Sequence, residues 1–229
     1  AHGFFRTQNV MVGLAEHYAS WGIRVVTMNL LHSSFIDNNP IQDAQDLNLL
    51  SNEIFESSPV IYMGHSAGGL RSVLAAVQDS NTIAVFGMDL VDLYMDDSFL
   101  GQDYCQELLV PLWGIFGEES SCNSNLNGLE IFNIASNGNA VRITEADHCD
   151  FESPTDLLCT NLCQDDNEIF SDEEVNSVIL NLSTSFLLWQ TGLNIDAQLL
   201  WNPENEYYQG LIFDGAIEQL TSLSLDYKK

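Results

Sequence analysis

The sequence predicts an α/β fold, in which helices cover both faces of a mostly parallel central sheet. Short apolar runs rich in β-branched residues alternate with longer segments whose apolar residues recur at helical spacing. Strands that alternate with helices in this way favour parallel pairing with both faces of the sheet covered. Polar connections follow several of the runs, and α/β proteins bind ligands at the carboxyl ends of their strands. We therefore expect the functional residues in these connections.

Helix and strand signals give the order of the elements. Val10, Leu14 and Tyr18 share one face of a first helix, which stops at a glycine. Ser171 is a typical N-cap for a long last helix, which has acidic residues in its first turn and Gly192 at its end. In chain order we expect a helix at 8–22, a buried strand at 23–30, a helix at 40–57 that starts near a proline, a strand at 59–64, a helix at 67–78, strands at 82–88, 110–117 and 139–144, and a helix at 171–192.

Composition and charge limit the class of protein. The 229 residues, 45% of them hydrophobic, suit one globular domain over residues 1–229. Six basic residues against 33 acidic ones give a formal net charge of −27, which disfavours binding to nucleic acid and to anionic membranes. Such an acidic excess is typical of salt-adapted proteins or of a lineage bias in composition. No apolar run approaches the ~20 residues needed to span a bilayer, so we expect no membrane span.

Three of the five cysteines are clustered in residues 149–163, directly after a histidine. The clustering predicts disulfides and an oxidising compartment, and hence a secreted or periplasmic protein. Because five is odd, at least one thiol is free or pairs outside the chain. The alternative is a zinc site formed by His148 and the cysteines that follow it, although their spacing matches no CxxC pattern. The cysteines are Cys105, Cys122, Cys149, Cys159 and Cys163.

Ser66 is the candidate nucleophile. It is the serine of a G-x-S-x-G pattern at residues 64–68, between a predicted strand and a predicted helix. In such a turn the serine has a strained backbone and an exposed hydroxyl, and the flanking glycines avoid collisions within the turn. The pattern alone is short, and a serine in a glycine-rich loop is the alternative. The strand-turn-helix context favours the nucleophile.

His148 is the candidate general base. It follows the last predicted strand, 82 residues after the candidate serine, which fits the chain order serine, acid, histidine. A surface-loop histidine is the alternative interpretation. The other histidines are too early in the chain, on a helix, or inside the serine motif itself, and they are His2, His17, His32 and His65.

The acid of the triad has several candidates. Asp89 ends the predicted strand at 82–88, 23 residues after the candidate serine. The loop after the next strand offers Glu118 and Glu119, which are offset by one or two residues from Ser120, a residue that cannot balance an imidazolium. Asp92 is a further candidate. We favour the first, since only the acid that orients Nδ1 of the histidine qualifies.

The oxyanion hole requires two backbone N–H groups. Ala67, directly after the candidate nucleophile, supplies the first. The early segment "HGFF" at residues 2–5 fits the loop that supplies the second, from Phe4. The ring of Phe4 is also positioned to line an acyl pocket, with ordinary packing as the alternative.

With these residues in place, the chain resembles the α/β-hydrolase superfamily over nearly its whole length. The matching segments are "HG" at 2–3, "GHSAGG" at 64–69, "GMDLVD" at 87–92 and "DHCDFE" at 147–152. Within the superfamily it is similar to the branch of chlorophyllases, platelet-activating-factor acetylhydrolases and cutinase-like polyester hydrolases. That resemblance implies Asp89 as the acid and an aromatic second donor in the oxyanion hole. The cysteine-containing stretches resemble those of a bacterial secreted subgroup.

One departure concerns the start of the chain. In the superfamily a central strand precedes the "HG" loop, whereas only Ala1 precedes it here. A sheet without that strand would leave buried backbone groups unpaired. We therefore expect the chain to be N-terminally incomplete or its first strands to be absent from a structure. The alternative is that the weakly alternating tail at 210–229 supplies strands.

The loops also allow specific disulfides. Loops after neighbouring strands lie side by side, so one arrangement pairs Cys122 with Cys149. Cys159 and Cys163 are four residues apart and would pair within one helical turn, which leaves Cys105 free. The sequence does not choose among the possible connectivities.

The expected function is hydrolysis of a carboxylic ester through an acyl-enzyme intermediate, with no metal or organic cofactor. Short connections give no sign of a large lid, so bulky, lipid or polyester-like esters are expected substrates, and we expect a monomer. An acyltransferase or an amidase is the alternative within enzymes. A non-catalytic binding protein on the same fold is the alternative outside them.

Overall fold

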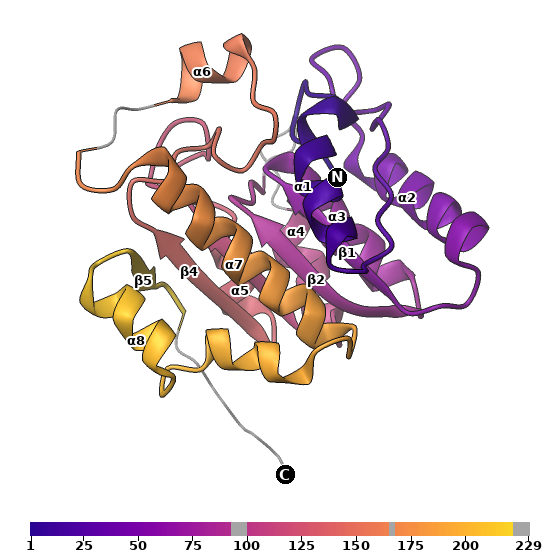
Figure 1. The fold of residues 1–229 in the computed structure, drawn as a ribbon. Helices are drawn as coiled ribbons and strands as arrows, with labels where there is room; N and C mark the ends of the chain where they lie inside the picture. Colours follow the sequence, from indigo (N-terminus) through magenta and orange to yellow (C-terminus); the bar gives the residue numbers. More distant parts are fainter. Residues whose placement is uncertain (93–99, 165–167, 222–229) are drawn as a thin grey trace.

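A computed structural model describes residues 1–92, 100–164 and 168–221, and it confirms the predicted α/β architecture. Figure 1 shows a twisted sheet between two layers of helices. The strand order is β1-β2-β3-β4-β5, in which β1 to β4 are parallel and β5 is antiparallel. The strands are β1 (Val60–His65), β2 (Thr82–Met88), β3 (Leu112–Phe116), β4 (Gly138–Ile143) and β5 (Ile217–Gln219).

Helices form on both faces of the sheet, as both sides of the parallel strands are apolar. One core lies between the sheet and α1, α7 and η3, and a second core lies between the sheet and α2, α3 and α5. The helical segments are η1 (Gln8–Met11), α1 (Val12–Ser20), α2 (Pro40–Phe55), α3 (Ala67–Gln78), α4 (Leu100–Tyr104), η2 (Cys105–Glu107), α5 (Leu129–Ile134), α6 (Leu157–Cys163), α7 (Asp172–Gln190), η3 (Ile195–Trp201) and α8 (Glu206–Phe213).

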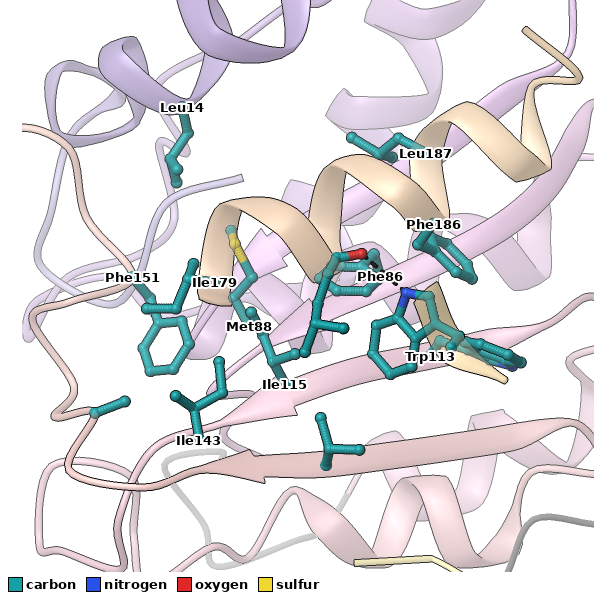
Figure 2. Close-up of a cluster of buried hydrophobic side chains, with 14 of the residues drawn as sticks. Leu14, Phe86, Met88, Trp113, Ile115, Ile143, Phe151, Ile179, Phe186 and Leu187 are labelled. Atoms are coloured by element: carbon teal, nitrogen blue, oxygen red, sulfur yellow. Dashed lines mark hydrogen bonds between the residues drawn. The ribbon is translucent and has the colours of Figure 1, made fainter. Parts of the chain in front are cut away.

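Aromatic rings fill the core beneath α7 (Figure 2). Trp113 of β3 packs edge-on against Trp201, with ring centroids 5.0 Å apart, and against Phe186 of α7 at 5.6 Å. The buried indole N–H of Trp201 donates to the Leu182 carbonyl at 2.9 Å, so its polar atom is satisfied. This core fixes the strands whose carboxyl ends carry the candidate site.

The long helix α7 confirms the predicted start and stop signals. Ser171 and Glu174 form a capping box, in which each side chain hydrogen-bonds the other residue's backbone N–H. The helix ends at Gln190, and Gly192 follows with a φ of +72° that suits glycine. The helices predicted at 40–57 and 67–78 also form, as α2 and α3.

A buried ion pair anchors α3 directly after the candidate serine. Arg71 Nε donates to Asp43 Oδ2 of α2 at 2.7 Å, and Nη1 donates to the Ala67 carbonyl at 3.0 Å. Both side chains of the pair are almost fully buried, so each charge depends on the other. The pair therefore holds the first turn of α3 against α2.

The strand predicted at 23–30 is wrong. The side chains alternate between half-buried and exposed from Ile23 to Thr27, but the segment joins no ladder among the described residues. An apolar cavity of about 420 Å³ lies between it and β1, and is lined by both, for example by Val25 and Ile61. Paired strands lie about 4.8 Å apart, and across the cavity the segment and β1 do not come that close.

Ala1 continues the sheet at this edge. Its amine donates to the Met63 carbonyl at 2.5 Å, and its carbonyl accepts from the His65 N–H at 3.0 Å, which is a parallel bridge to β1. The outer edge of β1 is otherwise unpaired in the described part of the chain.

The strand predicted at 139–144 forms as β4, but it is not the last strand of the sheet. The tail supplies a short strand, β5, whose Ile217 pairs with Ile143 of β4. This strand lies at the opposite edge from β1, so it does not fill the gap beside β1. Within the described residues, none of the helices combines the length and the hydropathy that crossing a membrane requires.

Candidate active site

Ser66 occupies a strained turn between β1 and α3, as the sequence predicts. Its φ of +55° and ψ of −129° lie in a region that side chains rarely adopt, and such strain persists only where the surroundings enforce it. The glycines on either side are required by contact. A Cβ on Gly64 would lie 2.2 Å from the Gly68 carbonyl oxygen, and one on Gly68 would lie 2.3 Å from the His2 carbonyl oxygen. The turn therefore accepts no larger residue at either position.

Asp89 and His148 come together at the carboxyl end of the sheet. His148 Nδ1 lies 2.5 Å from Asp89 Oδ2, although 59 residues separate them. Asp89 directly follows β2 and is fully buried, whereas His148 lies in the loop after β4. A carboxylate on Nδ1 fixes the ring orientation and leaves Nε2 as the nitrogen for proton transfer.

Backbone and side-chain donors hold the Asp89 carboxylate in place. Its other oxygen, Oδ1, accepts from the Gly117 N–H and from Asn123 Nδ2, both at 3.1 Å. Asn123 is fully buried and also donates to the Glu118 carbonyl at 2.7 Å. Sequence reasoning missed Asn123. The only signal for Asn123 in the sequence is its position in the loop after β3, which also carries the alternative acids Glu118 and Glu119.

The alternative acids are placed elsewhere. Glu118 faces Arg142 at 3.3 Å and accepts from the Glu145 N–H at 3.2 Å, while Glu119 is exposed to solvent. Asp92 is buried, and its carboxylate accepts the backbone N–H groups of residues 101 and 102 at the start of α4. The structure thus brings only Asp89 among these four candidates to the histidine.

The serine and the histidine lie on adjoining segments. The ring of His65, the residue before Ser66, lies 4.5 Å from the ring of His148. Burial lowers the pKa of His65 well below its usual range, and the nearby His148 lowers it further. His65 is therefore neutral and packs against the candidate base without competing for its proton.

The early loop lies against the serine. A Cβ on Gly3 would lie 3.1 Å from the Ser66 Cβ, so the backbone at Gly3 passes close to the serine. His2 Nε2 accepts from the Leu30 N–H at 2.8 Å, and burial lowers the His2 pKa to about 4, which keeps it a neutral acceptor. Phe4 directly follows Gly3, and Ala67 begins α3 on the other side.

The disulfides differ from the arrangement considered from the sequence, in which Cys122 pairs with Cys149 and Cys159 pairs with Cys163. Cys149 pairs with Cys159, and Cys122 pairs with Cys163, while Cys105 is free and buried. Cys159 and Cys163 both lie on α6, but they do not pair with each other. Each is bonded to a cysteine in a different loop. The alternative zinc site does not form, since its three cysteines are in disulfides. Two such pairs indicate an oxidising environment.

Asp150 gives a measurable pH dependence of stability next to the candidate base. Burial, together with the charge of Asp147, raises its pKa to about 7. The folded state therefore holds an extra proton between about pH 4 and pH 7, so stability falls as pH rises through this range. We expect Asp150→Asn to raise Tm at pH 8 by about 3 °C and to change it little at pH 4.

Thermal unfolding followed by circular dichroism at both pH values checks this. In wild type, Asp150 Oδ2 accepts a hydrogen bond from the Asp147 N–H at 2.8 Å. The side-chain oxygen of the introduced asparagine can accept the same bond. Asp214→Asn, at an exposed carboxylate after α8, is the matched control and should shift Tm equally at both pH values. An equal shift for Asp150→Asn would contradict the expectation.

Among the described residues, no group of histidine, cysteine, aspartate and glutamate side chains is arranged to hold a metal ion. Comparisons with protein-family models and with curated proteins find no match for the chain.

Proposed function

We propose that the chain is a carboxylic ester hydrolase of the α/β-hydrolase type, in which Ser66, His148 and Asp89 form a catalytic triad. The observation that carries the proposal is the 2.5 Å contact between His148 Nδ1 and the buried Asp89 carboxylate, beside a serine with a strained backbone. Strained nucleophile turns and buried acid–histidine pairs are each uncommon as structural features alone. Their occurrence at one edge of a parallel sheet supports a shared function.

The proposed reaction proceeds in two halves. Ser66 Oγ attacks the ester carbonyl carbon while His148 Nε2 takes its proton, and Asp89 stabilises the resulting imidazolium. The tetrahedral intermediate collapses, and the leaving alcohol takes the proton from His148. Water then attacks the acyl-enzyme with His148 again as base, which releases the carboxylic acid and restores Ser66.

Two backbone donors are proposed to stabilise the tetrahedral oxyanion. The Ala67 N–H lies at the amino end of α3, and the Phe4 N–H belongs to the loop whose Gly3 contacts the serine. Donors fixed in place before the reaction need no rearrangement when charge develops, and removing one typically costs about 10²–10³ in kcat.

Exposed apolar side chains around the loop that contacts the serine support a lipid or polyester-like substrate. The ring of Phe35 lies 4.9 Å from that of Phe4 and 5.1 Å from that of Phe5. Phe35 is 69% exposed and its neighbour Ile36 is 98% exposed, and contiguous exposed apolar surface of this kind often marks a binding site. We define Phe4, Phe5, Phe35 and Ile36 as the aromatic rim. It offers an apolar surface for the acyl part of an ester, and it begins at Phe4, which directly follows the Gly3 that contacts Ser66.

Hydrolysis of p-nitrophenyl butyrate by the purified chain tests the proposed function. Release of p-nitrophenol that saturates with substrate is expected. Transfer of the acyl group to an added alcohol in preference to water would instead indicate an acyltransferase, and cleavage of the matching anilide would indicate an amidase. Absence of all three activities would favour a binding protein and contradict the proposal.

The aromatic rim predicts a selective effect of Phe35→Ser. Activity on a tributyrin emulsion should fall about 5- to 10-fold, because losing one partly buried ring contact weakens binding by about 1–1.4 kcal/mol. Hydrolysis of soluble p-nitrophenyl acetate, whose acyl group is too short to reach the rim, should stay within twofold.

Leu109→Ser is the matched control for the aromatic rim. Leu109 is also highly exposed but precedes β3, at the amino edge of the sheet away from the site. An equal loss on the emulsion for both variants, or an equal loss on both substrates for Phe35→Ser, would contradict a role for the rim.

We propose that the protein is secreted or periplasmic and acts as a monomer without nucleic-acid partners. The two disulfides support an oxidising location, and the net charge of −27 disfavours polyanionic partners.

A further inference from the structure

Arg6 forms a buried ion pair that joins two loops of the site. Its Nε donates to Glu152 Oε1 at 2.7 Å, and its Nη2 donates to Glu152 Oε2. Nη2 also lies 3.0 Å from Asp156 Oδ1. The Arg6 side chain is 10% exposed and that of Glu152 is 1% exposed. Two parallel bonds fix the orientation of a guanidinium as well as its distance, which a single contact does not.

Both acidic partners lie in a loop that starts at the candidate base. Glu152 is four residues after His148, and Glu152 and Asp156 both lie between Cys149 and Cys159. The disulfide between these cysteines closes the loop over a separation of ten residues. The loop to which Arg6 binds is therefore restrained by a disulfide, and it directly follows His148 in the chain.

The other end of the pair lies in the oxyanion-hole loop. Arg6 is two residues after Phe4, and its N–H donates to the Gly3 carbonyl at 3.3 Å, which closes a tight turn. Gly3 contacts Ser66, and Phe5 within the turn has a φ of +56°. A non-glycine residue in this region needs external support, so the turn depends on contacts such as the ion pair.

A third contact connects the ion pair to the base itself. Glu152 Oε1 lies 3.7 Å from His65 Nδ1, and the His65 ring packs against the His148 ring. Burial raises the pKa of Glu152, and the hydrogen bond from Arg6 opposes that rise. Without Arg6, a buried carboxyl group would lose its partner next to the catalytic centre.

We infer that Arg6 is a positioning residue, which sets the Phe4 donor of the oxyanion hole relative to His148 by gripping Glu152 and Asp156. The inference rests on the proposed function, because it assigns Arg6 to the geometry of that reaction. Arg6 acts through the loop backbone and not on the substrate. Its loss should weaken the binding of the tetrahedral state while ground-state binding stays nearly unchanged.

The test compares Arg6→Gln and Arg6→Lys with wild type, using p-nitrophenyl butyrate and phenylboronic acid, whose tetrahedral adduct with Ser66 mimics the oxyanion. In Arg6→Gln we expect kcat to fall about 10- to 100-fold, with KM within twofold, since small misplacements of catalytic groups have effects of this size. The inhibition constant of phenylboronic acid should rise in parallel. Arg6→Lys should recover part of both, because an ammonium pairs without bidentate geometry.

Arg142→Gln is the matched control and should leave all three quantities unchanged, because Arg142 pairs with Glu118 and Glu218 at the surface. If Arg6→Gln does not fold, Glu152→Gln takes its place, with the same expected pattern. Wild-type kcat and inhibition constant in the folded variant, or equal changes in kcat and KM, would overturn the role of Arg6 alone. A wild-type chain that neither hydrolyses the ester nor binds the boronate would overturn the proposed function and this inference together.

Discussion

Replacing Ser66 with alanine is expected to lower kcat for p-nitrophenyl butyrate by at least about 10⁴-fold. The reaction then lacks its nucleophile, and only the oxyanion donors and substrate binding remain to accelerate attack by water. Alanine keeps the Cβ of serine, so the strained backbone at φ +55° stays equally strained. Tm should therefore change by no more than about 2 °C, which separates lost chemistry from lost structure.

Ser72→Ala is the matched control for the nucleophile. Ser72 is a buried serine on α3, six residues after Ser66, and its hydroxyl donates to the Gly68 carbonyl at 2.9 Å. Its removal should cost some stability but leave kcat within about threefold. Residual activity of a tenth or more in Ser66→Ala would rule out Ser66 as the nucleophile.

Replacing Asp89 with asparagine is expected to lower kcat by about 10³- to 10⁴-fold. An amide in this position does not stabilise the imidazolium, and an NH₂ group directed at Nδ1 favours the wrong histidine tautomer. The substitution keeps the volume of the side chain and its ability to accept from Gly117 and Asn123 through Oδ1. A pH-rate profile of the variant and a thermal melt check the chemistry and the fold separately.

Glu118→Gln tests the competing acid. Because Glu118 is paired with Arg142 and the Glu145 N–H, we expect kcat to stay within twofold of wild type. The opposite pattern, with a large loss at Glu118 and little at Asp89, would show that the acid is supplied from the loop after β3.

The sequence was sufficient for the elements whose signals are local. Ser171 with its capping partner, and the apolar runs of β2 and β3, form what their own residues favour. Residues 23–30 show the limit of such signals. Their composition favours a strand, but a strand exists only when a partner lies beside it, and a cavity occupies that place. The short strand β5 has too few residues to give a clear period before its pairing with β4 is known.

In the candidate site as well, residues within a local motif were predictable from the sequence, whereas contacts between distant residues were not. Ser66 and its glycines belong to one continuous motif, so the strained turn was predictable. Asp89 and His148 followed from chain order, but their contact depends on the packing of separate loops. Asn123 and the Arg6–Glu152 pair were missed because they act across distances of 34 and 146 residues, for which a single sequence carries no signal. The disulfide connectivity was missed for the same reason.

The most direct measurement for the proposed triad is covalent labelling with a fluorophosphonate, followed by mass spectrometry of the intact chain and of its peptides. Such reagents react with a serine hydroxyl only when a neighbouring base activates it. The expected result is a single phosphonyl adduct on the peptide that contains Ser66, at a rate that falls sharply in Asp89→Asn and to zero in Ser66→Ala. No adduct on the folded wild-type chain, or an adduct on another residue with Ser66 unmodified, would contradict the catalytic assignment.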